Sequence, residues 1–163
     1  MSIHVRPAQP GDIEAIAAGN IAMALEAEHK HLDPPTVRRG VQAVFDTPGH
    51  GCYFIAEIDD QIVGQAMYTY EWSDWRNGVF WWFQSVYVTP DARRRGVFRA
   101  LYRHIEDLAK ADPNVCGLRL YVERDNARAQ QTYARCGMQD AGYLVMEVDM
   151  SGAVRSASGG RPC

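Results

Sequence analysis

The sequence predicts a single α/β domain of the α+β kind, because strand and helix patterns alternate along most of its 163 residues. A chain of this length can enclose one sizeable hydrophobic core. The expected order is strand, two helices, three strands, helix, strand, helix and strand, over residues 3–149. The stretch 151–163 is rich in Ser, Gly and Arg and is expected to be a disordered tail.

Turn and cap residues delimit the first elements. A strand is expected at residues 3–7, and Pro10-Gly11-Asp12 then opens a helix. The buried face of that helix is predicted from helical spacing to contain Ile13, Ile16, Ala17, Asn20 and Ala24. Asp33-Pro34-Pro35-Thr36 interrupts the chain and starts a second helix, which reaches about residue 45.

Strand patterns dominate the middle of the chain. Strands are expected at 52–58 and 61–71, joined by Asp59-Asp60, a hairpin signal. A loop at 72–78 leads to a further strand at 79–88.

The remaining elements follow a turn at Gly96. The helix that begins there is expected to bury Val97, Leu101, Ile105 and Leu108. A strand at 116–122, a helix capped by Asn126 and a last strand at 138–148 complete the predicted domain.

The segment 84–99 is the most informative stretch of the chain. An apolar strand runs to Thr89-Pro90, a basic loop turns at Gly96, and a helix begins at once. A helix N-terminus presents backbone N–H groups and a positive dipole end to an anion, and the run Arg93-Arg94-Arg95 adds charged donors suited to phosphate. This pattern indicates a pyrophosphate-binding loop, although a solvated basic turn before an ordinary helix has the same pattern.

The order of residues is more specific than the charge. Val86-x-Val88-x-Pro90-x-x-Arg93-x-x-Gly96 resembles the acetyl-CoA-binding motif of the GNAT N-acetyltransferases, except that Phe98 stands where the family has a small residue. Asn126-x-x-Ala129-x-x-x-Tyr133-x-x-x-Gly137-Met138 resembles the second motif of the same family. Without the resemblance, Tyr133 would be read as a core aromatic residue and Asn126 as a simple cap.

The resemblance, which covers roughly residues 3–149, implies a GNAT fold: a central, mixed, mostly antiparallel and splayed sheet flanked by helices. It also implies acetyl-CoA as cosubstrate, with the pantetheine arm bonded to the strand that ends near Val88. The cofactor-binding residues implied in this way are Val86, Tyr87, Val88, Arg93, Arg94, Arg95, Gly96, Val97, Phe98, Arg99, Asn126, Ala129 and Tyr133.

The resemblance further implies acetyl transfer to a primary amine by direct attack in a ternary complex. A backbone N–H near Val86 would stabilise the developing oxyanion, and Tyr133 is the candidate general acid. Gln84 and Ser85 stand where polyamine-type relatives carry acidic residues, so the general base passes to Glu71, to Asp74 or to a water chain.

An acidic and aromatic run is the candidate acceptor site. Aromatic faces beside carboxylates suit a cationic amine, and the expected substrate-binding residues are Glu28, Trp72, Asp74, Trp75 and Gln84. The tryptophans are equally explained as core residues or as the interface of a homodimer. Glu26 and Glu28 are two residues apart, so at most one of them can face the acceptor.

Composition restricts the possible partners. The chain has 17 basic and 20 acidic side chains and only a short arginine run, so no nucleic-acid partner is expected. No apolar stretch approaches a membrane span, and the N-terminus lacks a signal-peptide core, so the expected setting is cytoplasmic. Cys52, Cys116, Cys136 and Cys163 show no Cys-x-x-Cys spacing, so no metal is expected.

Three functional alternatives to acetylation of a small amine differ in their sequence support. Acceptors on proteins, either lysine side chains or N-termini, are the nearest competitor. A CoA-binding module without turnover is compatible with the departures at Phe98 and Gln84. A dinucleotide-binding oxidoreductase is excluded, because the glycine loop lies mid-chain and lacks Gly-x-Gly-x-x-Gly.

Overall fold

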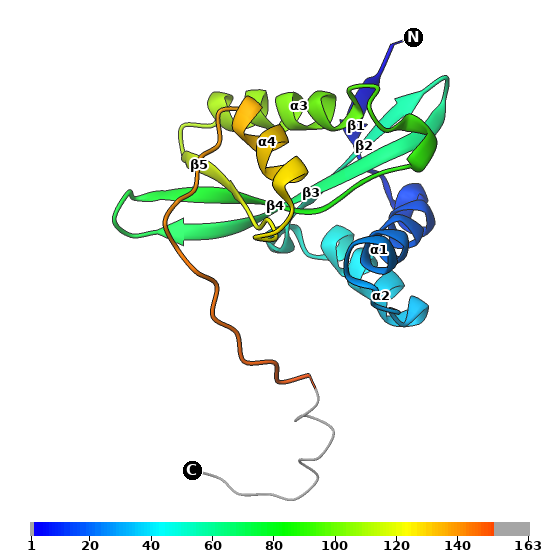
Figure 1. The fold of residues 1–163 in the computed structure, drawn as a ribbon, viewed down its shortest axis with the longest axis horizontal. Coiled ribbons are helices and arrows are strands. Elements are labelled where there is room, and N and C mark those ends of the chain that lie inside the picture. Colours follow the sequence, from blue (N-terminus) through cyan, green and yellow to red (C-terminus); the bar gives the residue numbers. More distant parts are fainter. Residues whose placement is uncertain (1, 152–163) are drawn as a thin grey trace, which may run out of the picture. The chain divides into compact units, whose positions relative to one another are not determined.

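A five-stranded sheet organises the first part of the chain in the computed structural model, which describes residues 2–151 (Figure 1). By internal contacts, the chain divides into two compact units, residues 1–124 and 125–163, and the sheet belongs to the first. Its strands are β1 (His4–Pro7), β2 (Cys52–Ile58), β3 (Gln61–Ser73), β4 (Gly78–Val88) and β5 (Val115–Leu120). They lie in the order β1-β2-β3-β4-β5, and only the β4–β5 pair is parallel. The predicted mixed, mostly antiparallel sheet is confirmed.

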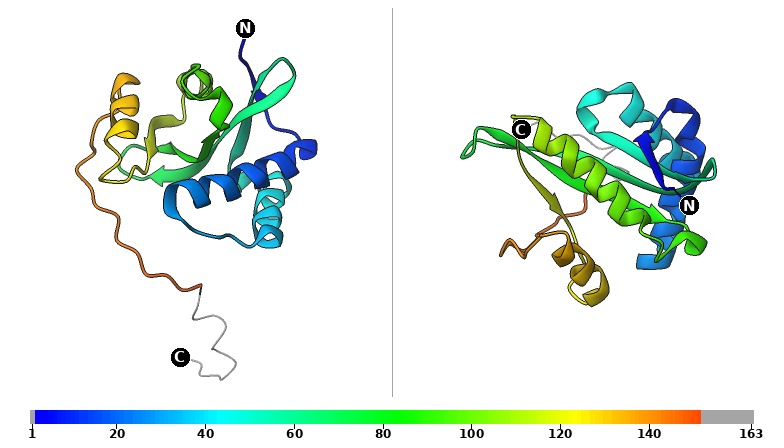
Figure 2. Two further views of the ribbon diagram at one scale, coloured as in Figure 1. Left: turned by 45° about the vertical axis from the view of Figure 1, so that its right-hand side comes forward. Right: turned by 90° about the horizontal axis from the view of Figure 1, so that it is seen from above.

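Helices cover both faces of this sheet. Helices α1 (Ile13–Glu28) and α2 (Pro34–Asp46) lie on one face, and α3 (Val97–Ala111) crosses the other (Figures 1 and 2). Three short 3₁₀ turns, Pro10–Asp12, Pro48–His50 and Pro90–Ala92, connect these elements. The chain therefore forms a three-layer arrangement over residues 2–124.

Local signals in the sequence set several element boundaries. The Asp33 side chain accepts a hydrogen bond from Thr36 N at 3.0 Å and caps α2, as the Asp-Pro-Pro-Thr pattern predicts. Asp59 and Asp60 both adopt positive φ, 51° and 60°, which is the backbone of a tight β2–β3 hairpin. Arg6 bonds both Asp12 and Glu57 and so joins the start of α1 to β1 and β2.

The core has two parts, one on each side of the sheet. Between α1, α2 and the sheet lie the buried side chains of Ile13, Ile16, Ala17, Val41, Tyr53 and Ile55. On the other face, α3 buries Val97, Leu101, Tyr102, Ile105 and Ala109. The predicted stripe of α3 is wrong at Leu108, which is 40% exposed. The buried positions 97, 101, 105 and 109 advance by four residues, so Ala109 takes the last place on that face.

The β3–β4 hairpin is longer than predicted, because its two strands pair with each other beyond their predicted ends. The expected loop at 72–78 is shorter, because β3 continues to Ser73 and Trp72 pairs with Val79 of β4. Strand β5 ends at Leu120, two residues before the predicted end. Both differences arise because strand ends are fixed by the partner strand, which local composition does not describe.

The second unit contains helix α4 (Ala127–Arg135), and Asn126 is its N-cap. Gly137 follows the helix at a φ of 87°, a conformation that glycine adopts at little cost.

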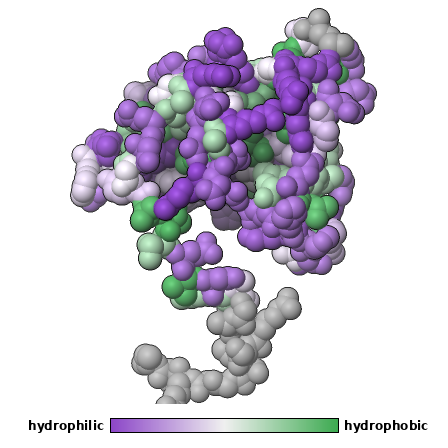
Figure 3. Space-filling model, viewed as in Figure 1, coloured by the Kyte–Doolittle hydropathy of each residue, from purple (hydrophilic) through white to green (hydrophobic). Residues whose placement is uncertain are grey.

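The prediction of a strand at 138–148 is wrong, because none of the ladders among residues 2–151 includes this segment. Most of its apolar side chains are exposed instead, as is Met150 just beyond it (Figure 3): Tyr143, Leu144, Val145, Met146 and Val148. An apolar pattern gives a strand only where a neighbouring edge supplies hydrogen bonds. Apart from Ser151, the predicted tail at 151–163 lies outside the described residues.

Candidate functional site

Strand β4 is paired on both sides along only part of its length. Its segment from Val79 to Phe83 pairs with β5, and Phe83 meets Leu120, the last residue of that strand. Beyond Phe83, the ladders of residues 2–124 pair β4 with β3 alone, as far as Val88. The sheet therefore splays here, and the edge of residues 84–88 that faces away from β3 is outside the β4–β5 ladder.

The same segment contains a β-bulge. Gln65 pairs with Tyr87 and Met67 pairs with Gln84, so Ser85 and Val86 together face one residue of β3. Ser85 adopts a φ of 50°, which a residue with a side chain rarely does. A bulge takes backbone groups out of the regular ladder and re-aims the neighbouring residues. Sequence reasoning missed this feature, because no glycine marks it.

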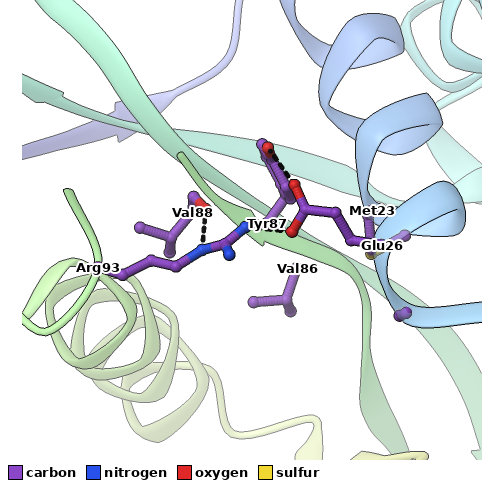
Figure 4. A pocket seen from close by; sticks show the side chains of 7 residues that line it. Met23, Glu26, Val86, Tyr87, Val88 and Arg93 are labelled. Carbon is purple, nitrogen blue, oxygen red and sulfur yellow. Dashed lines mark hydrogen bonds and ion pairs between the residues drawn. The ribbon is translucent and has the colours of Figure 1, made fainter. Parts of the chain in front are cut away.

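A pocket of about 300 Å³ lies beside the bulge, between α1 and the end of β4 (Figure 4). Its lining residues come from these two elements and the following loop: Met23, Glu26, Ala27, Val86, Tyr87, Val88 and Arg93. Three of the predicted cofactor-binding residues, Val86, Tyr87 and Val88, therefore share one wall with the motif residue Arg93.

The polar groups of the pocket converge on Glu26 of α1. Its carboxylate accepts a hydrogen bond from the Tyr87 hydroxyl at 3.2 Å and forms an ion pair with Arg93 (Figure 4). Arg93 also donates from Nε to the carbonyl of Val88 at 3.0 Å. The pKa of the Tyr87 phenol is raised, mainly by burial and secondly by the nearby Glu26 carboxylate. The phenol therefore remains a neutral hydrogen-bond donor.

Glu26 is the site residue that the predicted substrate-binding set lacked. Helical spacing allowed only one of Glu26 and Glu28 to face the acceptor, and Glu28 pairs instead with Lys30 at 2.5 Å. Helical spacing gave no signal for Glu26, because a residue two positions after the buried Ala24 does not share its helical face.

The basic loop after β4 has the backbone of a tight turn into α3. Arg94 and Gly96 adopt positive φ, 64° and 88°, and Gly96 is the N-cap of the helix. A Cβ atom at Gly96 would meet only Ile3 Cδ1, at 4.0 Å, so conformation rather than space requires glycine. No side chain within the described part of the chain caps this helix, so its first turn presents backbone N–H groups.

The other loop residues divide between core and surface. Val97 is buried and anchors the start of α3, whereas Arg94, Arg95 and Arg99 are exposed. The ring of Phe98 is half-buried and packs against Tyr102, with 6.0 Å between ring centroids. Phe98 therefore packs along its own helix.

Comparison with known proteins identifies the family. Residues 21–138 match the model of the acetyltransferase (GNAT) family. The chain belongs to the GNAT family. A search among curated proteins gave no significant match.

Solved structures agree with this assignment to the GNAT family. A possible acetyltransferase from Clostridium difficile 630 is 41% identical, with a TM-score of 0.85 over 91% of this chain and 98% of that chain. A ribosomal-protein-alanine N-acetyltransferase from Brucella melitensis is 14% identical, with a TM-score of 0.73 over 91% and 99% of the two chains. Glucosamine-6-phosphate N-acetyltransferase from Arabidopsis thaliana is 13% identical, with a TM-score of 0.69 over 91% and 99%. The last two share the fold alone.

The second GNAT motif lies on α4 in the second unit. The Asn126 side chain accepts a hydrogen bond from Ala129 N at 3.0 Å, so it caps the helix, and Tyr133 follows two turns later. The pKa of the Tyr133 phenol is raised, mainly by burial and secondly by the neighbouring Cys136. A phenol in this state stays protonated at neutral pH and can donate a proton.

The predicted acidic and aromatic run lies at the other end of the β3–β4 hairpin. Glu71 pairs with Phe80, which is six residues before Val86, a separation of roughly 20 Å along a strand. Its carboxylate accepts a hydrogen bond from Arg119 at 2.7 Å. The structure therefore does not bring Glu71 to the pocket.

The other predicted residues of this run, Trp72, Asp74 and Trp75, lie farther still along the hairpin. Trp72 is 62% exposed, and Asp74 and Trp75 occupy the turn, where Trp75 is 86% exposed. The fifth predicted substrate residue, Gln84, is half-buried at the start of the half-paired segment of β4. None of the five predicted substrate-binding residues is among the side chains that line the pocket; Gln84 stands two residues before the lining residue Val86.

Neither a cluster of metal-binding side chains nor a membrane-spanning helix occurs in the described range. Residues 2–151 contain no group of three or more His, Cys, Asp or Glu side chains placed to hold a metal ion. Within the same residues, no helix has the length and apolar character needed to cross a membrane.

Proposed function

We propose that this GNAT protein transfers an acetyl group from acetyl-CoA to a small primary amine, by direct attack in a ternary complex. The observation that carries the proposal is the pocket in which the half-paired backbone of β4 meets the Glu26 carboxylate. One wall offers backbone hydrogen bonds and the other offers negative charge beside apolar surface. These are the needs of an amide-rich arm and of a cationic amine, respectively.

The residues present fit acetyl-CoA at two places. The edge of residues 84–88 that is outside the β4–β5 ladder suits the amides of the pantetheine arm, in the way that a sheet edge suits a peptide. The Arg93–Gly96 turn and the first turn of α3 suit its pyrophosphate, through backbone N–H groups and arginine donors. Asn126 and Ala129 complete the predicted set from the second motif.

The acceptor amine is placed by Glu26. An ammonium group that pairs with this carboxylate would have the side chains of Met23, Ala27 and Val86 around it. A pocket of about 300 Å³ matches a small molecule better than a folded protein segment. This charge and size favour a small aliphatic amine over a protein acceptor.

The protein groups that assist the reaction have separate roles. Bound acetyl-CoA would supply the acetyl group as a thioester. The N–H of Val86 would stabilise negative charge on the thioester oxygen, and the Tyr133 hydroxyl would supply a proton to the departing sulfur. The bound ammonium must lose a proton before it attacks, because only the neutral amine is a nucleophile. Glu71 lies roughly 20 Å along the strand from Val86, so a water chain rather than Glu71 would carry this proton away.

A panel of acceptors tests this proposal. Purified protein is mixed with acetyl-CoA and with small aliphatic amines, amino sugars, lysine peptides or peptides with a free N-terminal alanine, and thiol release is recorded. Turnover with the small cationic amines is expected. Turnover confined to the peptides would show a protein acceptor, and CoA binding without any turnover would indicate a binding module.

The cofactor part has its own test in Gly96→Asp. Wild-type protein is expected to gain thermal stability with CoA by mass action. The variant introduces a carboxylate at the phosphate position and a side chain at a φ of 88°, and it should lose this gain. A CoA-induced shift of normal size in the variant would contradict the assignment of the loop.

A further inference from the structure

Gln65 is a polar side chain enclosed between α1 and the bulge of β4. It lies on β3, opposite Tyr87, and is only 3% exposed. A buried amide is costly unless its polar atoms have hydrogen-bond partners. The partners of Gln65 therefore indicate what it does.

The amide of Gln65 connects three elements. Its Nε2 donates to Asn20 Oδ1 at 2.8 Å and to the carbonyl of Ile16 at 3.3 Å, both on α1. The same nitrogen approaches the carbonyl of Ser85, the bulge residue, at 3.5 Å. Asn20 in turn donates to the Tyr53 hydroxyl on β2 at 3.2 Å. A chain of polar side chains thus runs from β2 through α1 to the bulge.

The helix leaves room for this amide at Gly19. A Cβ atom there would lie 2.4 Å from Gln65 Oε1, which is too close. Glycine inside a helix is unfavourable relative to alanine. The presence of glycine at this place in α1 is therefore explained by the side chain that it accommodates.

Ser85 needs such support. A serine at a φ of 50° is in a conformation that the chain adopts only when its surroundings hold it there. The bulge carbonyl lies next to the Gln65 amide, and that amide is itself fixed by two shorter bonds to α1. The direction of the following N–H, that of Val86, depends on this backbone conformation.

We propose that Gln65 is a positioning residue: with Gly19 and Asn20, it holds the bulge at Ser85 and so aims the N–H of Val86 into the pocket. The catalytic part of this inference rests on the proposed function, in which that N–H stabilises the oxyanion. The geometric part does not, because it concerns the conformation of β4 alone.

Two variants and a matched control test the proposal. Gln65→Leu removes the amide, and Gly19→Ala displaces it while favouring the helix. Misaiming a group at the reacting centre should lower kcat by about 10–100-fold. The Kd for CoA should change less than kcat, because the phosphate loop is untouched and only the pantetheine arm lies against residues 84–88. Ile105→Val shortens a fully buried side chain on the opposite face of the sheet and should leave kcat per folded molecule unchanged.

A rescue experiment separates positioning from general loss of stability. Glycine adopts positive φ freely, so adding Ser85→Gly to Gln65→Leu should recover kcat by about fivefold. The NMR chemical shifts of Cα and Cβ of Ser85 and Val86, which report backbone conformation, give a readout without substrates, and they should change in Gln65→Leu and Gly19→Ala but not in Ile105→Val.

The outcomes separate this inference from the proposed function. If the wild-type protein acetylates no amine, the proposed function fails, and the chemical shifts of Ser85 and Val86 alone decide the role of Gln65. Unchanged shifts at Ser85 and Val86 in both variants would overturn the inference, and so would equal kcat in Gln65→Leu and Ile105→Val.

Discussion

Replacing Glu26 by Gln should strengthen CoA binding and weaken acceptor binding at the same time. The carboxylate holds Arg93, the arginine of the phosphate motif, by an ion pair. We expect Arg93 to leave this pair when the pyrophosphate binds, and the acceptor ammonium to replace it. Gln keeps the shape of the side chain and removes only the charge. The variant therefore loses both the ion pair with Arg93 and the charge that would bind the acceptor ammonium.

The size of each effect follows from exposure. The side chains of Arg93 and Glu26 are 41% and 42% exposed, and a pair at such a surface contributes about 0.2–1 kcal/mol. Releasing Arg93 from this competition should lower the Kd for CoA by at most about fivefold. The amine loses a charge-assisted hydrogen bond worth about 1.5–3 kcal/mol, so its KM should rise by about tenfold or more.

Calorimetric titration with CoA and steady-state kinetics with the best amine of the panel measure the two effects. Glu28→Gln is the matched control, because it removes the same charge two residues away, from a carboxylate paired with Lys30. It should change neither constant. The reasoning is refuted if Glu26→Gln leaves both constants unchanged, or if Glu28→Gln reproduces its effects. Raising the ionic strength should shrink the gain in CoA affinity, since salt screens exposed pairs.

Two further substitutions test other parts of the molecule. Tyr133→Phe should lower kcat by about 10²–10⁴-fold while CoA affinity persists, and equal stopped-flow rates of thiol release in both proteins would show that the ring only packs. Asp12→Asn should cost roughly 1–3 kcal/mol of unfolding free energy at pH 7, because Arg6 lowers the pKa of this carboxyl by hydrogen bonding. The stabilisation by Asp12 is complete above the unfolded-state pKa and disappears as pH falls through the lower folded-state pKa. Thermal melts should therefore show the two proteins converging in acid, and a gap that is constant from pH 7 to pH 2 would contradict this assignment.

Element boundaries were predictable wherever a side chain acts on backbone within a few residues. Asp33 and Asn126 cap the helices that they precede, and Gly96 turns the chain into α3, as their patterns predict. The predictions were wrong where a structure depends on a neighbouring element of the fold. The segment 138–148 has an apolar strand pattern without a ladder in the described structure, and Leu108 continues a stripe that the sheet does not cover.

The parts of the candidate site that are close together in the sequence were predictable, but the residues that the fold brings to them from other elements were not. The motif placed Val86, Tyr87 and Val88 beside Arg93, and these residues do line one pocket. Helical spacing could exclude a joint role for Glu26 and Glu28, but the choice between them depends on where β4 lies. The run from Glu71 to Trp75 has the right chemistry for an amine, yet the length of the hairpin carries it away from Val86.

The position of the pocket follows from two interruptions of one strand. Strand β4 loses β5 after Phe83, because β5 has no residue beyond Leu120 to continue the ladder. Two residues later, Ser85 breaks the register with β3 as well. A regular strand in the middle of a sheet would use both backbone edges for its neighbours and present none to a ligand. Five residues of β4 therefore combine a rigid scaffold on one side with an edge outside the β4–β5 ladder, and α1 sets a carboxylate beside them. Neither interruption is encoded by a glycine or a proline within residues 84–88, so the site depends on tertiary contacts such as those of Gln65 rather than on local sequence.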